Sequence, residues 1–107
     1  ADAYIEFVYP DKPRGFLLEL DRDTEELRFW TDKIRRLCAF IESDSYQEHY
    51  DLFHGVIVVV PNQARVDLLT RWTDQSLTRL GRPSWLQLFR FTTHDIATDP
   101  ERLPTIL

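Results

Sequence analysis

The chain has 107 residues, of which 43% are hydrophobic and 29% are charged, so we expect one domain spanning 1–107 with a single core. Its formal net charge of -5 argues against a freestanding duplex-binding module, because such modules carry a net basic face. The longest apolar run, residues 56–60, is too short to cross a bilayer, and the single cysteine, Cys38, excludes an internal disulfide. We therefore expect a cytoplasmic protein without membrane contacts.

The first twenty residues predict a β-hairpin. Side chains alternate between apolar and polar over residues 2–9, and alternate again over 16–21, as in half-buried strands. Between them, residues 10–15 are dense in proline and glycine, which favour a short turn. The second alternation puts Glu19 and Asp21 on one face. Because the chain opens directly in a strand without an initiator methionine, we expect a fragment that lacks N-terminal elements.

A helix is predicted next. The Asp23 side chain is placed to accept a hydrogen bond from the free backbone amide three residues on, and the Glu26 side chain to accept one from the Asp23 amide. This reciprocal pattern is typical of a helix start. The apolar residues that follow recur at steps of three and four, as on one face of a helix. They are Leu27, Trp30, Ile34, Leu37, Cys38 and Ile41. Residues 46–53 fit either a short helix or a loop.

The second half of the chain repeats a strand and a helix. The β-branched run at 56–60 has no alternation and predicts a central strand covered on both faces. A helix is expected from about residue 63 to 80, ended by 81–83, and a last strand from 85 to 93. Helical crossovers make neighbouring strands parallel. The sequence therefore predicts an α/β fold with a mixed four-stranded sheet (β-β-α-β-α-β) flanked by helices.

Three carboxylates are the main candidate for chemistry. Glu19 and Asp21 leave one face of a strand about 7 Å apart, and an antiparallel hairpin brings Asp2 beside them. Carboxylates held together repel unless a cation neutralises them, and hard oxygen ligands suit Mg²⁺ or Mn²⁺. Such a metal could activate water beside a phosphate.

Each of these acids also has an ordinary interpretation, which spacing alone favours. Asp2 can be a solvated strand end, Glu19 a surface carboxylate, and Asp21 part of a helix cap. Lys33, two turns into the first helix, could reach the carboxylates, or its stem could follow the edge of the core with the ammonium in water. At the end of the last strand, Thr93 or Asp95 fits a cap for the following turn better than a site residue.

Several segments together resemble the replication-relaxation family of bacterial plasmid and mobile-element proteins. The resemblance rests on Asp2-Ala3 opening a strand, on Phe-Leu-Leu-Glu-Leu-Asp-Arg-Asp-Thr-Glu at 16–25 and on the downstream Lys33. The strand ending in proline at 56–61 and Phe-Thr-Thr at 91–93 agree with it. The similarity covers most of the chain.

This resemblance implies a relation to the PD-(D/E)XK nuclease superfamily, with a restriction-endonuclease-like core that lacks its first helix and strand. Asp2 then stands for the first acid of the motif and Glu19 for the second. The chain departs from the motif in two places. Ala1 stands where a proline precedes the first acid, and Asp21 stands where the lysine would be. Lys33 could supply the missing charge from the helix.

The implied function is that of a nuclease-like domain of a plasmid or mobile-element replication or mobilisation protein. It would be a magnesium-dependent deoxyribonuclease, with Asp2, Glu19 and Asp21 on Mg²⁺ or Mn²⁺ and Lys33 near the scissile phosphate. DNA would be bound through a winged-helix region outside this chain. The alternative is a non-catalytic domain of the same fold, used for homodimer formation or protein contacts in a DNA-processing assembly.

Overall fold

The computed structural model describes residues 3–8, 13–21, 26–43 and 53–106. Its elements in chain order are β1 (Ala3–Val8), β2 (Pro13–Leu20), α1 (Leu27–Glu42), β3 (Phe53–Val60), α3 (Gln63–Arg79), the 3₁₀ turn η1 (Pro83–Leu88), β4 (Phe89–Thr93), α4 (His94–Ala97) and the 3₁₀ turn η2 (Leu103–Ile106). In the described part of the chain, no helix combines the length and apolarity that a bilayer span requires.

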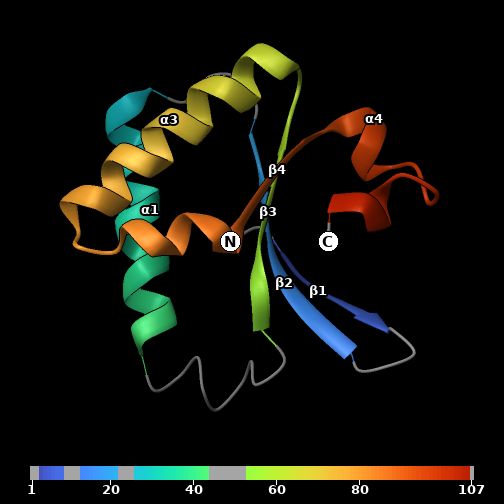
Figure 1. Ribbon diagram of the computed structural model, residues 1–107, viewed down its shortest axis with the longest axis horizontal. Coiled ribbons are helices and arrows are strands. Elements are labelled where there is room, and N and C mark those ends of the chain that lie inside the picture. The colour runs from blue at the N-terminus through green and yellow to red at the C-terminus, as the bar shows by residue number, and fades with distance from the viewer. Residues whose placement is uncertain (1–2, 9–12, 22–25, 44–52, 107) are drawn as a thin grey trace.

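The four strands form one sheet in the order β1-β2-β3-β4. β1 pairs antiparallel with β2, from Ala3 opposite Leu18 to Val8 opposite Pro13, and the other neighbours are parallel. The predicted α/β fold with a mixed four-stranded sheet is confirmed. The connections β2-α1-β3 and β3-α3-β4 advance in the same direction across the sheet. With the right-handed crossover that parallel strands adopt, both helices lie on the same face of the sheet. Figure 1 shows α1 and α3 together on one side of the sheet and α4 on the other.

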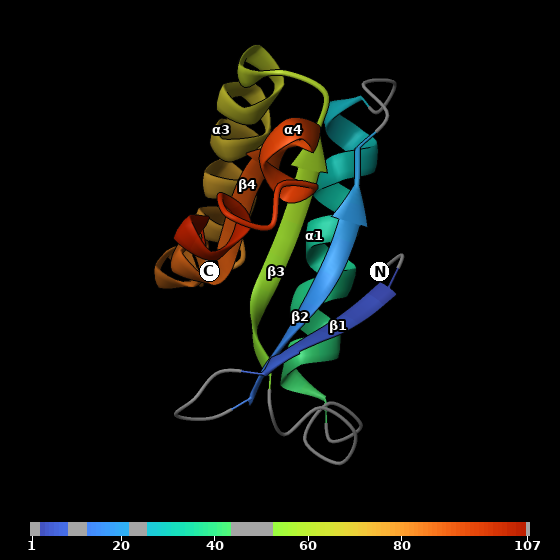
Figure 2. The ribbon, with the colours of Figure 1, turned by 90° about the vertical axis from the view of Figure 1, so that its right-hand side faces the viewer.

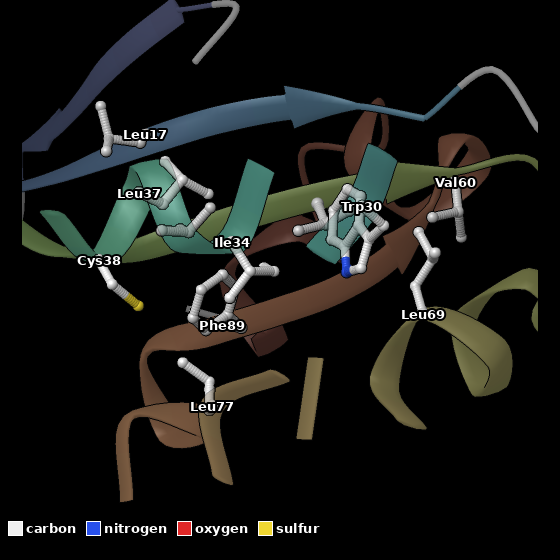
Figure 3. Packing of buried hydrophobic residues seen from close by; sticks show 11 residues of the cluster. Leu17, Trp30, Ile34, Leu37, Cys38, Val60, Leu69, Leu77 and Phe89 are labelled. Carbon is white, nitrogen blue, oxygen red and sulfur yellow. The ribbon is translucent and has the colours of Figure 1, made fainter. Parts of the chain in front are cut away.

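The main core lies between the sheet and the layer made by α1 and α3. Figure 3 shows side chains of both helices meeting those of β2, β3 and β4 there. Trp30 is fully buried at its centre, and its indole Nε1 donates to Thr73 Oγ1 across the two helices at 2.9 Å. Cys38, which the sequence places on the apolar face of the helix, is buried at 5% exposure. This packing fixes α1 and α3 relative to the carboxyl ends of the strands.

The opposite face of the sheet carries a smaller apolar cluster. Phe16, Ile57 and Val59 are buried there, with Leu18 and Ala97 packed against them. Figure 2 views this face, with α4 in front of β3 and α1 behind the sheet. β3 is thus covered on both sides, which confirms the prediction of a central strand from its unbroken β-branched run.

Both ends of α3 agree with the prediction. Asn62 Oδ1 accepts from the Arg65 amide at 2.9 Å, which caps the first turn. At the other end, Gly81 takes a left-handed φ of 74°, and the amide of Arg82 donates to Leu77 O at 2.8 Å. Glycine reaches this conformation without steric cost, so it ends the helix as expected.

Two predicted boundaries are wrong. α1 begins at Leu27 with Glu26 in the N-cap position and no side-chain cap bond, and the expected cap Asp23 lies outside the described residues. The last strand begins at Phe89 and not at Trp85, because Pro83 opens a 3₁₀ turn in which the Trp85 amide donates to Arg82 O. The apolar residues of that turn still pack on the core, which explains their strand-like pattern.

Candidate functional site

Glu19 and Asp21 lie at the carboxyl end of β2, on the face that α1 and α3 cover. Each residue is only 3% exposed. Asp21 follows the last residue of β2, and its amide donates to Val59 O at 2.9 Å, which continues the pairing with β3. In open α/β sheets, ligands bind outside the carboxyl ends of the parallel strands. The two acids that the alternation predicts on one face are therefore in the region where such folds hold their sites.

Asp21 is held by an arginine from α3. Arg65 Nε donates to Asp21 Oδ2 at 2.7 Å and the second guanidinium nitrogen to Oδ1 at 3.1 Å. The side chains are 7% and 0% exposed, and the guanidinium also lies 5.4 Å from the centre of the Trp72 ring. Both oxygens of Asp21 are thus engaged in a buried bidentate pair, the strongest form of charge-assisted hydrogen bonding. The pair links the end of β2 to the first turn of α3.

Glu19 is paired with Lys33 of α1. Lys33 Nζ lies 3.5 Å from Glu19 Oε2, and the lysine side chain is 22% exposed while that of Glu19 is 3% exposed. The ammonium also lies 5.4 Å from the centre of the Trp30 ring. Of the two alternatives considered for Lys33, the structure has the one in which the side chain reaches a carboxylate. The ammonium keeps a path to solvent, so this pair can be approached from outside.

Arg65 is the residue that sequence reasoning missed. It lies four residues before Leu69 and eight before Thr73, on the buried face of α3, where a charged side chain requires a partner. That spacing was a usable signal, since an arginine in line with an apolar stripe needs a nearby acid. The partner itself, Asp21, is 44 residues away in sequence.

Asp2, the third predicted ligand, lies outside the described residues. The described part of β1 begins at Ala3, which pairs with Leu18, the residue before Glu19. Among the residues that the structure describes, no three acidic, histidine or cysteine side chains are grouped closely enough to hold a metal ion. The described carboxylates of the predicted set are therefore Glu19 and Asp21, each beside a cationic side chain.

Other charged and polar residues of the described chain pair away from these two acids. Arg35 and Arg36 both pair with Asp32 on the exposed side of α1, as surface arginines are expected to do. Thr93 occupies the N-cap position of α4, and its hydroxyl bonds to the carboxylate of Asp95. That hydrogen bond lowers the pKa of Asp95. Thr93 makes no side-chain hydrogen bond to the backbone of this turn, so the cap interpretation holds for its position only.

Comparison with known proteins adds no relative. The chain matches no known family, no curated protein and no solved structure.

Proposed function

We propose that this chain is a nuclease-like domain of a plasmid or mobile-element replication or mobilisation protein, hydrolysing phosphodiesters with a divalent cation. The observation that carries the proposal is the contact of Lys33 with the buried Glu19, 3.5 Å apart at the carboxyl end of β2. It joins an acid and a lysine, the two side-chain types that the resemblance to the replication-relaxation family implies for a PD-(D/E)XK site. The lysine comes from the helix instead of the strand.

Each member of the pair has a definite task in such a reaction. Hydrolysis forms a bond from a water oxygen to phosphorus and breaks the bond to the leaving oxygen, which takes up a proton. The ammonium of Lys33 donates hydrogen bonds to a phosphate oxygen and offsets the charge that develops there. Its 22% exposure allows a phosphate to approach it, whereas the 3% exposure of Glu19 keeps the carboxylate in a region with little water.

Glu19 is also the described residue best suited to hold Mg²⁺ or Mn²⁺, because a carboxylate is the hard oxygen ligand that both ions prefer. The cation would supply Lewis-acid activation of water. Asp2 is the other carboxylate that the proposal assigns to the cation. Asp21 would have to give up bonds to Arg65 in order to bind the ion, so in the proposal it chiefly positions the end of β2.

The charge of the chain limits how it would meet DNA. With a net charge of -5, it lacks the overall basic surface that holds a duplex by counterion release. We therefore propose that most of the affinity for duplex DNA comes from a region outside this chain, and that the domain contributes the chemistry.

The test is a cleavage assay on supercoiled, linear and single-stranded DNA with Mg²⁺, with Mn²⁺ and with EDTA. Wild type should cleave only with a cation. Glu19→Gln should lower the rate at least about 100-fold and Lys33→Ala at least about tenfold, as for losing a group that acts directly on the reacting atoms. Calorimetric titration should detect Mn²⁺ binding to wild type and lose it in Glu19→Ala.

Glu42→Gln and Arg35→Ala are the matched controls, because they alter a glutamate and a basic residue in exposed ion pairs of the same helix. Both should cleave like wild type. Equal cleavage by all variants would identify a contaminating nuclease, and no cation binding in wild type would overturn the metal-dependent mechanism.

One observation favours a non-catalytic version of the fold. Arg65 holds both oxygens of Asp21 in a buried pair, which removes one acid of the predicted site from easy access to a cation. In that case the domain would serve homodimer formation or protein contacts in a DNA-processing assembly. Sedimentation of wild type would then reveal a dimer, and the Glu19 and Lys33 variants would change stability without any activity to lose.

A further inference from the structure

An aromatic side chain is exposed next to the proposed site. Phe29 in the first turn of α1 is 54% exposed, more than the other large exposed apolar residues of the described chain. Those are Leu20, Leu27 and Leu80, at 40 or 41%. The guanidinium of Arg28 lies 4.8 Å from the centre of the Phe29 ring. Arg28 therefore lies against the ring, and the 54% exposure of Phe29 still leaves ring surface for a stacking partner.

Phe29 shares one flank of α1 with two cationic residues. At 3.6 residues per turn, Phe29, Lys33 and Arg36 fall within about 60° of one another around the helix axis. Residues four apart are neighbours on a helix, with Cβ atoms about 5–6 Å apart, so the ring lies beside the lysine that contacts Glu19. The opposite flank of α1 is occupied by α3, through Thr31 and Ser76. The aromatic flank is the one that α3 leaves uncovered.

The charge of α1 differs from that of the whole chain. The helix carries four basic residues (Arg28, Lys33, Arg35 and Arg36) and two acidic ones (Asp32 and Glu42), a net charge of +2 in a chain of -5. Lys33 pairs with Glu19, and Arg35 and Arg36 pair with Asp32, so a negatively charged ligand on this helix would compete with these carboxylates for the cations. The combination of an exposed ring with adjacent cations is how proteins hold unpaired nucleotides, with a base on the ring and phosphates on the cations.

We propose that the flank formed by Phe29, Lys33 and Arg36 binds single-stranded nucleic acid and leads its backbone to Glu19. This inference rests on the proposed function and adds its substrate class, a single strand or an unpaired end. A base within a duplex has both faces stacked, so it cannot use the ring. One short basic flank is also enough for a few phosphates but not for a duplex.

The test measures binding of a fluorescent 12-nucleotide DNA strand and of the matching duplex to the 107-residue chain in EDTA, at low salt. Wild type should bind the strand at least about tenfold more tightly than the duplex. Phe29→Ala should weaken strand binding about tenfold, the effect of losing one stacked base, while Phe29→Tyr keeps the ring and stays within about twofold of wild type. Arg36→Ala should remove about one phosphate contact. The slope of the logarithm of the binding constant against the logarithm of the salt concentration should then become less steep by about 0.7.

Leu80→Ala is the matched control, because Leu80 is an exposed apolar residue at the end of α3, away from this flank. It should bind like wild type. Equal binding of strand and duplex would overturn the inference. So would wild-type affinity in Phe29→Ala, and a loss of self-association in that variant on sedimentation would then identify a protein interface instead.

The two proposals fail in different ways. Glu19→Gln should lose cleavage, while its strand binding should still fall when Phe29→Ala is added. Phe29-dependent strand binding without any cleavage supports the inference and contradicts hydrolysis, whereas cation-dependent cleavage that ignores Phe29 supports hydrolysis and contradicts the inference.

Discussion

Two ion pairs stand two residues apart at the end of β2 and differ in almost every physical respect. Asp21 and Arg65 are both buried and share two hydrogen bonds of 2.7 and 3.1 Å. Glu19 and Lys33 meet at 3.5 Å, and the lysine is 22% exposed. Arg65 comes from the capped first turn of α3, whereas Lys33 comes from an open flank of α1. Whether a carboxylate at this end of β2 is accessible to solvent therefore depends on which helix supplies its cationic partner, and not on the acid itself.

The largest expected effect comes from breaking the closed pair. Arg65→Ala leaves the carboxylate of Asp21 buried without its partner, which should destabilise the fold by about 3–5 kcal/mol. Urea denaturation followed by tryptophan fluorescence measures the loss, because Trp30 is fully buried in the core.

A double variant separates the charge from the packing. Asp21→Leu with Arg65→Met replaces the pair by apolar side chains of similar volume, which should recover most of the lost stability. A loss below about 1 kcal/mol in Arg65→Ala would mean that Asp21 is reached by solvent, and the contrast between the two pairs would disappear.

The open pair should matter less for folding. Lys33→Met keeps an unbranched apolar side chain at this position but removes the ammonium from Glu19 and from the Trp30 ring, at an expected cost of about 2 kcal/mol. The same denaturation experiment measures it, repeated in 1 M salt, where the difference from wild type should shrink because solvent reaches the lysine. A loss of unfolding free energy equal to that of Arg65→Ala would mean that the Glu19–Lys33 pair is as inaccessible to solvent as the Asp21–Arg65 pair.

The smallest expected effect concerns the cap that positions Arg65. Asn62→Ala removes the side-chain acceptor of the Arg65 amide and should cost about 1 kcal/mol. In a double-mutant cycle with Arg65→Ala, the two losses should not add, since the cap and the guanidinium belong to one turn. Additive losses would indicate that the arginine is positioned by Asp21 alone.

Much of the fold followed from local pattern. Alternation placed Glu19 and Asp21 on one face, the unbroken β-branched run marked the central strand, and glycine ended α3, because each of these depends only on nearby residues. The last strand was started too early, since apolar residues of a 3₁₀ turn at 83–88 also face the core and imitate a strand.

The ion-pair partners of Asp21 and Glu19 could not be identified from the sequence pattern. Asp21 and Arg65 are 44 residues apart, and their contact depends on how α3 packs over the end of β2. Spacing could indicate that an arginine on the buried face of α3 needs an acid, but several acids were available. The helix position of Lys33 indicated that it could reach the carboxylates. Which carboxylate it contacts, Glu19, depends on how α1 packs on β2.

The buried Cys38 makes the helical layer experimentally visible. Burial, assisted by the nearby Glu42 carboxylate, raises the pKa of its thiol, so the folded chain holds the sulfur protonated and shielded. Thiol reagents attack the thiolate and need access to it. The rate at which a disulfide reagent labels Cys38 therefore measures how often α1 separates from the core. Bound single-stranded nucleic acid that stabilises α1 would lower this labelling rate without contacting the sulfur.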